Sequence, residues 1–153
     1  MGWGEIEEPV AIRRDGVFTL GQARQLLPII IRITDVACTR VDDLILELET
    51  SASNRPDAIA RVEAEIQRVV TQWNEKIEKL GAHPKGLWLV DFMFGRGYYC
   101  WKYPEPDLLY WHGLDDGFSG RKPIEGNNFE KVQTEETGSP SRAGSDQFPP
   151  RGL

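Results

Sequence analysis

His112 is the residue best suited to chemistry in this sequence, and it lies in an aromatic-rich stretch from residue 85 to 124 that holds all four tyrosines. A neutral imidazole can ligate a transition metal or haem iron, or act as a general base. The alternative role is structural, with the ring buried among aromatic side chains and held by one hydrogen bond. No other ligand-type residue accompanies His112 at a metal-site spacing. The sequence leaves both roles open, and a transition metal or haem is the cofactor expected for the first.

Four more residues form a candidate functional cluster with His112. Cys100 is predicted on the same sheet face, where a Cys–His pair could bind a metal or form a nucleophile, although a strand cysteine is more often a small core residue. Asp91 stands in an apolar strand and needs a buried partner, for which we expect Arg121. Glu105, in a turn, offers a second carboxylate to a metal bound by His112. No complete catalytic set is present, so no catalytic residue is assigned.

Helical spacing governs the chain from residue 18 to 81. Thr19 and Gln22 form a capping box that begins a short N-terminal helix. Pro28 has no amide hydrogen, so it must start a new helix or kink a continuing one. Apolar residues then recur every three or four positions from 29 to 48 and from 59 to 80, with a polar loop at 51–56. These two segments are predicted to pack as a long antiparallel hairpin.

The pattern then changes to β-branched and aromatic residues that alternate, which predicts a small three-stranded antiparallel sheet from residues 86–94, 98–103 and 108–112. A first hairpin centred on Arg96 would place Asp91 opposite Trp101. A second hairpin around Glu105 would place Tyr99 opposite Trp111. The expected fold class is therefore α+β.

Both faces of this predicted sheet are apolar, whereas an antiparallel sheet usually alternates apolar with polar residues. The helical hairpin can cover only one face. The other face, carrying Tyr99, Trp101 and Trp111, is therefore predicted to contact a protein partner or a second copy of the chain, because an exposed patch of this size is unusual.

The ends of the chain have a different composition from the middle. Residues 1–17 are interpreted as an N-terminal arm, residues 18–124 as a single α+β domain, and residues 125–153 as an irregular tail with few hydrophobic residues. Such a tail cannot offset its ordering entropy by itself. We therefore expect Phe129 and Phe148 to hold it on a surface of this chain or of a partner.

Charge and hydropathy exclude several classes of function. The net charge of −6 argues against nucleic-acid binding, which needs a basic surface. No apolar run approaches the roughly 20 residues of a membrane span, so no membrane insertion is expected. With two cysteines and no secretory signal, the sequence predicts reduced thiols and a cytoplasmic location.

A series of short motifs in a fixed order is similar to a known family. The motifs are Phe18-Thr19-Leu20, Ala23-Arg24, Leu26-Leu27-Pro28, Val90-Asp91-Phe92, Cys100-Trp101, Glu105, Tyr110-Trp111-His112 and Gly117-Phe118-Ser119-Gly120-Arg121. Over residues 18 to 124 they resemble the small bacterial family catalogued as domain of unknown function 2203. In that family a glycine usually precedes the turn glutamate, where this chain has Pro104. The resemblance implies an architecture and a set of residues without a mechanism.

Three classes of function follow, in order of preference. The first is a non-catalytic interaction or assembly subunit that uses the aromatic sheet and the tail. The second is a metal- or haem-binding protein with His112 as ligand. The third is a small enzyme that uses His112, Asp91 and Arg121.

Overall fold

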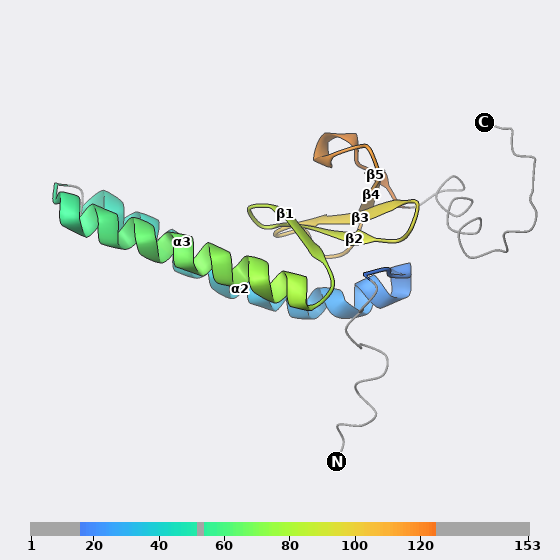
Figure 1. Cartoon of the computed structure of the whole chain (residues 1–153), viewed down its shortest axis with the longest axis horizontal. Helices are drawn as coiled ribbons and strands as arrows, with labels where there is room; N and C mark the ends of the chain where they lie inside the picture. The colour runs from blue at the N-terminus through green and yellow to red at the C-terminus, as the bar shows by residue number, and fades with distance from the viewer. Residues whose placement is uncertain (1–15, 52–53, 125–153) are drawn as a thin grey trace, which may run out of the picture.

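The computed structural model describes residues 16–51 and 54–124, which form two long helices and a five-stranded antiparallel sheet (Figure 1). The fold class is therefore α+β, as predicted. The sheet lies over one half of the helical pair, and the loop end of the pair extends beyond it (Figure 1). Residues 1–15 and the predicted tail contacts Phe129 and Phe148 lie outside the described residues.

Helix α2 runs without interruption over Leu20–Thr50 and contains Pro28. The capping box of Thr19 and Gln22 is confirmed, with each side chain bonded to the other's backbone amide. The prediction of a separate short helix before Pro28 is wrong. An interior proline costs a helix about 3 kcal/mol, but the buried stripe continues across Pro28, from Leu27 to Ile30. Burial of that stripe offsets the cost and keeps one helix.

Helix α3, Pro56–Lys79, packs antiparallel against α2, which confirms the helical hairpin. It begins with a proline at its first position, where no amide hydrogen is needed. Gly81 follows its end with φ 92°, a left-handed conformation that favours glycine. Between the helices the indole Nε1 of Trp73 donates a 2.8 Å hydrogen bond to Thr34 Oγ1, so these two buried polar groups satisfy each other.

The sheet has the order β1-β2-β3-β4-β5, so every strand pairs with its neighbour in sequence. The prediction of three strands missed β1 and β5. Strand β1 contains Pro84, which an edge strand tolerates because half of its backbone groups need no partner in the sheet, and β5 is two residues long. The strand bounds are β1 His83–Gly86, β2 Leu89–Met93, β3 Gly97–Lys102, β4 Tyr110–Gly113 and β5 Lys122–Pro123, with a 3₁₀ turn, η1, at Phe118–Gly120 before β5.

The hairpin between β2 and β3 differs from the prediction by one residue in register. Its loop has two residues, Gly95 and Arg96, closed by a 2.9 Å hydrogen bond from the Phe94 amide to the Gly97 carbonyl. Gly95 has φ 104°, which glycine adopts without strain. Asp91 therefore pairs with Cys100 and not with Trp101. A shift of one residue moves every side chain of a strand to the other face.

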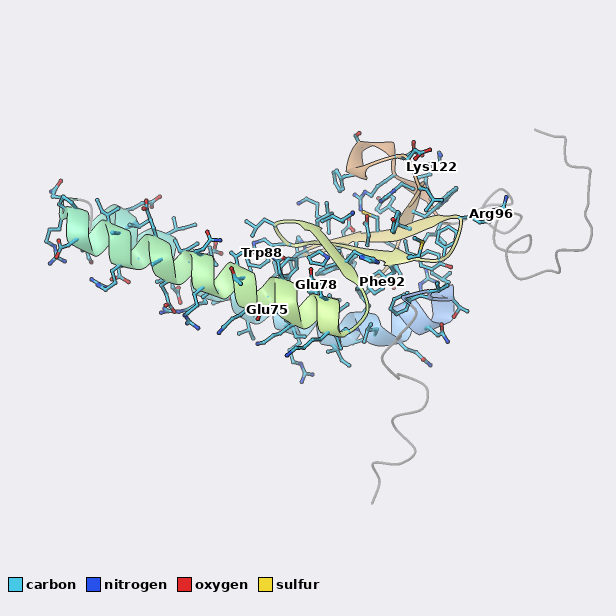
Figure 2. All side chains as sticks on the ribbon, in the orientation of Figure 1. Glu75, Glu78, Trp88, Phe92, Arg96 and Lys122 are labelled. Atoms are coloured by element: carbon cyan, nitrogen blue, oxygen red, sulfur yellow. The ribbon has the colours of Figure 1, made fainter. Side chains whose placement is uncertain are left out.

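The hairpin between β3 and β4 has the predicted register, with Tyr99 opposite Trp111. The face that packs on the helices carries Val90, Phe92, Tyr99 and Trp101, all fully buried. Trp88 and Phe92 lie in the layer between the sheet and the helices (Figure 2). The prediction that Tyr99 and Trp101 contact a partner is therefore wrong, because the helical hairpin covers them. Trp111 remains half-buried at the edge of this face.

Trp88 holds the turn between β1 and β2 against helix α3. Its φ of 62° is rare for a bulky residue and costs backbone energy. Its ring packs edge-on against Trp73, with 5.1 Å between ring centroids. This contact compensates for the strain and fixes the sheet on the helical pair.

Within the described residues, neither helix combines the length and the apolar character that a membrane crossing requires.

Candidate functional site

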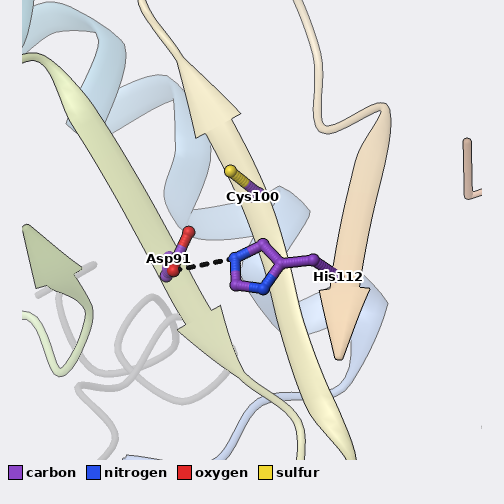
Figure 3. Close-up of side chains that lie close together, drawn as sticks. All are labelled: Asp91, Cys100 and His112. Atoms are coloured by element: carbon purple, nitrogen blue, oxygen red, sulfur yellow. Dashed lines mark hydrogen bonds and ion pairs between the residues drawn. The ribbon is translucent and has the colours of Figure 1, made fainter. Parts of the chain in front are cut away.

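Asp91, Cys100 and His112 come together on the sheet face that points away from the helices (Figure 3). They belong to β2, β3 and β4, three successive strands of the sheet. One carboxylate oxygen, the thiol sulfur and one ring nitrogen all lie within 4.8 Å of one another. The three residues are 2%, 0% and 3% exposed. They are thus a buried polar cluster on this face of the sheet, and we refer to them as the Asp–Cys–His cluster.

Both ring nitrogens of His112 have partners. Nδ1 lies 2.9 Å from the carbonyl oxygen of Gly113, which can only accept, so Nδ1 carries a hydrogen. Nε2 lies 3.0 Å from Oδ2 of Asp91. One proton is therefore shared between Nε2 and the Asp91 carboxyl group. The backbone carbonyl fixes both the orientation of the ring and the direction of Nε2, which points at Asp91.

The partner expected for Asp91 was Arg121, and this prediction is wrong because His112 takes that place. The second carboxyl oxygen of Asp91, Oδ1, is buried and has no hydrogen-bond partner within the described part of the chain. An unsatisfied buried oxygen is costly, and native proteins keep few of them. Oδ1 is therefore a free ligand atom inside the cluster.

Cys100 is unsuited to act as a nucleophile. Burial raises the pKa of its thiol, and the negative charge of Asp91 raises it further, while Arg121 lowers it only in part. A thiol must lose its proton to react. His112 has no nitrogen left to accept that proton, because one binds Gly113 and the other binds Asp91. The three residues are therefore not arranged as a Cys–His catalytic pair.

Arg121 and Glu105, the other two predicted members of the cluster, pair with each other beside it, and Arg121 also acts on the Cys100 thiol. The guanidinium contacts the carboxylate through two atom pairs, at 3.1 and 3.0 Å. It also stacks on the ring of Tyr110, 4.1 Å from the centroid, and on the ring of Phe118 at 4.2 Å. Glu105 accepts a further 2.8 Å hydrogen bond from the Lys102 amide. The pair fastens the loop before β5 to the turn before β4.

Sequence reasoning named every residue of the cluster but placed Asp91 on the other face. It also missed the carbonyl of Gly113, which orients His112 and which no side-chain motif reveals. The correct face of Asp91 could have been predicted from the length of the Gly95–Arg96 loop, because a two-residue connection is the commonest kind in hairpins. With that loop, alternation along the strands brings Asp91 to the side of Cys100.

The fold and this site define a small α+β protein in which a helical hairpin supports one sheet face and a buried Asp–Cys–His cluster occupies the other. The chain belongs to the family described as uncharacterized conserved protein (DUF2203), whose model matches residues 16–124. That range includes every residue of the cluster and the Arg121–Glu105 pair. No curated protein and no solved structure matches the chain.

Proposed function

We propose that this chain binds a divalent transition metal ion through Asp91, Cys100 and His112. The observation that carries the proposal is the convergence of three different ligand atoms inside 4.8 Å, with Oδ1 of Asp91 buried and without a hydrogen-bond partner among the described residues. Nitrogen, sulfur and carboxylate oxygen together suit zinc and its neighbours, whereas calcium and magnesium prefer oxygen alone.

The histidine is oriented as metal-binding histidines usually are. Its Nδ1 hydrogen is held by the Gly113 carbonyl, and its Nε2 faces the other two ligands. A second partner of this kind fixes the tautomer and strengthens the ligand. Ligand bonds of about 2.0–2.3 Å require the three atoms to draw closer together than the 4.8 Å limit. Small side-chain rotations of Cys100 and Asp91 would supply that movement.

Charge balance also favours a divalent ion. Without metal, the neutral thiol of Cys100 and the single proton shared by Asp91 and His112 give the cluster a net charge of zero. A divalent ion that displaces both protons leaves a thiolate, a carboxylate and a neutral imidazole, and the sum is again zero. Burying net charge is expensive, so this exchange avoids the largest cost of a buried metal site.

Haem fits the cluster less well than a single ion. The Asp91 carboxylate lies 3.0 Å from Nε2, the atom that would bind the haem iron, and so stands where the macrocycle would lie. Three protein ligands around an ion leave a fourth position for water or a substrate. The proposed metal ion would therefore have an open coordination position at which a reaction could occur, in addition to any structural role. The sequence-based alternative of an enzyme using Arg121 loses support, because Glu105 and two aromatic rings engage that side chain.

The test uses cobalt, because cobalt bound to a thiolate has a sulfur-to-metal charge-transfer absorption. We expect the purified chain to bind one cobalt ion with this absorption and to bind zinc in competition. Cys100→Ser should abolish the absorption while leaving the circular dichroism spectrum unchanged. Cys38→Ser is the matched control, because Cys38 lies on helix α2, half-buried and outside the cluster, and it should behave as the wild type.

The same titration has a pH arm. Metal binding must displace the proton of the thiol, whose pKa burial has raised, and the proton shared by Asp91 and His112. Two protons released correspond to an apparent affinity that rises about 100-fold per pH unit. Affinity that does not depend on pH, or an absorption that survives Cys100→Ser but not Cys38→Ser, would contradict the proposal. Metal content below one equivalent at saturating cobalt would contradict it as well.

A further inference from the structure

A groove of about 370 Å³ lies between helices α2 and α3, and every residue that lines it belongs to one of the two helices. Its two rims are rows of residues four apart along each helix. Arg32, Val36 and Arg40 form the rim on α2, and Arg68, Gln72 and Lys76 form the rim on α3. Residues at this spacing lie on one ridge of a helix. Eight residues of helix span about 12 Å, or slightly more than two turns.

The rims carry four positive charges, although the chain as a whole has a net charge of −6. Glu65 is paired with two of the cations, Arg40 at 3.7 Å and Arg68 through a closer two-bond contact. The other two, Arg32 and Lys76, form no ion pair within residues 16–51 and 54–124. The groove is therefore a basic strip with a net charge of about +3 when Glu65 is counted.

Between the rims the groove has an apolar floor. Ile33, Ala37, Val69 and Trp73 form this floor. Val36, on the α2 rim between two arginines, is 65% exposed, the largest exposed fraction among the exposed large hydrophobic residues of the described chain. When a partner covers apolar surface of this kind, the binding free energy becomes more favourable by about 25 cal/mol for each Å² of apolar surface buried. The arrangement combines an apolar centre with charged edges, as protein-binding grooves do.

We propose that this groove binds an amphipathic helix of a partner protein, with the apolar stripe of that helix on the floor and its acidic residues against the two rims. A third helix between two packed helices continues the ridge-and-groove packing already present. Charge complementarity defines the partner, because aspartate or glutamate on both sides of its stripe would meet Arg32 on one rim and Lys76 on the other.

The charges, the shape and the apolar floor of the groove argue against the other occupants. A second copy of the chain using this face in a symmetric dimer would place the four cations of one groove against the four of the other. A membrane surface is too broad to enter a concave groove between two helices. A nucleic acid would leave the apolar floor without a complementary surface.

The test measures binding of a fluorescent helical peptide by anisotropy at low salt. The peptide carries leucine at helical spacing with glutamate on both flanks, and a second peptide has lysine in place of each glutamate. We expect the acidic peptide to bind, to weaken as salt screens the charges, and to lose about tenfold or more in affinity with the double variant Arg32→Glu/Lys76→Glu. That variant should instead bind the lysine peptide.

The matched control is Arg61→Glu/Lys79→Glu, which makes the same change in charge at exposed positions of α3 that do not line the groove. It should leave both affinities within about twofold of wild type. Equal loss in the two variants, no binding of the acidic peptide, or preferential binding of the wild type to anionic vesicles would overturn the proposal. Failure here leaves the metal site untouched, because the two proposals share no residue.

Discussion

The two faces of the sheet are built from the same strands and yet have opposite chemistry. The face on the helices carries Val90, Phe92, Tyr99 and Trp101, all without exposure and without a charged group. The outer face buries an acid, a thiol and an imidazole beside one another. Burial is therefore not what distinguishes the two faces. The helix-facing side uses burial to exclude water from apolar surface, and the outer side uses it to hold polar atoms in a fixed geometry.

The largest expected effect is on the helix-facing side. Trp101→Ala removes a fully buried ring and leaves the Glu105 carbonyl without the 2.8 Å hydrogen bond from the indole nitrogen. We expect the free energy of unfolding to fall by about 3–5 kcal/mol, as measured by urea denaturation. Trp111→Ala is the control, because Trp111 is half-buried at the edge of the same face. An equal or larger loss for Trp111→Ala would contradict the comparison.

On the outer side we expect a mutation to reduce stability by an intermediate amount and to abolish metal binding. His112→Gln keeps a donor near Asp91 but lacks the imidazole, so the metal-free protein should lose about 1–3 kcal/mol of stability. Cobalt binding should disappear altogether.

His83→Gln is the control for that experiment, because His83 lies across from Asp91 on β1 but is exposed. It should change stability by less than about 0.5 kcal/mol. If His112→Gln lowers stability as much as Trp101→Ala while cobalt still binds, the outer cluster is part of the core and not a site.

The smallest effect concerns the solvent edge of the helix-facing side, where the Tyr103 hydroxyl donates a 2.5 Å hydrogen bond to Asp35 on α2. This bond raises the pKa of Tyr103 to about 12. The folded state therefore holds a proton that the unfolded state releases near pH 10, so this contribution to stability is complete below pH 10 and is lost as pH rises towards 12. Asp35→Asn should bring the pKa of Tyr103 down, which ultraviolet difference titration can follow. An unchanged titration would show that the bond does not form in solution.

Local patterns predicted the helices well, and pairing between segments was the source of the errors. The capping box at Thr19 and the three-and-four spacing depend on neighbouring residues, so they can be read directly. Pro28 was misjudged because its local cost is offset by burial of the flanking residues in the hydrophobic core, which is a tertiary effect. Strand β1 was missed because Pro84 is normally a signal against a strand, and only its position at the sheet edge permits it.

The candidate site shows the same division. Its three residues were each identifiable from type and context, since an acid in an apolar strand and a histidine after two aromatic residues are both unusual. Their meeting was not predictable from type, because it depends on the register of β2 against β3. Arg121 and Glu105 were placed in the cluster for their charge, whereas the structure satisfies them with each other.

The two-residue loop of Gly95 and Arg96 has a consequence for how this site can be lost. Successive side chains of a strand point to opposite faces. The number of residues in the loop therefore decides whether Asp91 lies on the same sheet face as Cys100 or on the opposite face. One inserted residue would move the carboxylate to the helix side and bring Val90 or Phe92 to the outer side, without altering any of the three ligands. A comparison of the three ligand residues alone would therefore not reveal that the site had been lost. Whether a chain of this family can assemble the cluster is thus decided by counting residues in the turn as much as by reading the residues of the site.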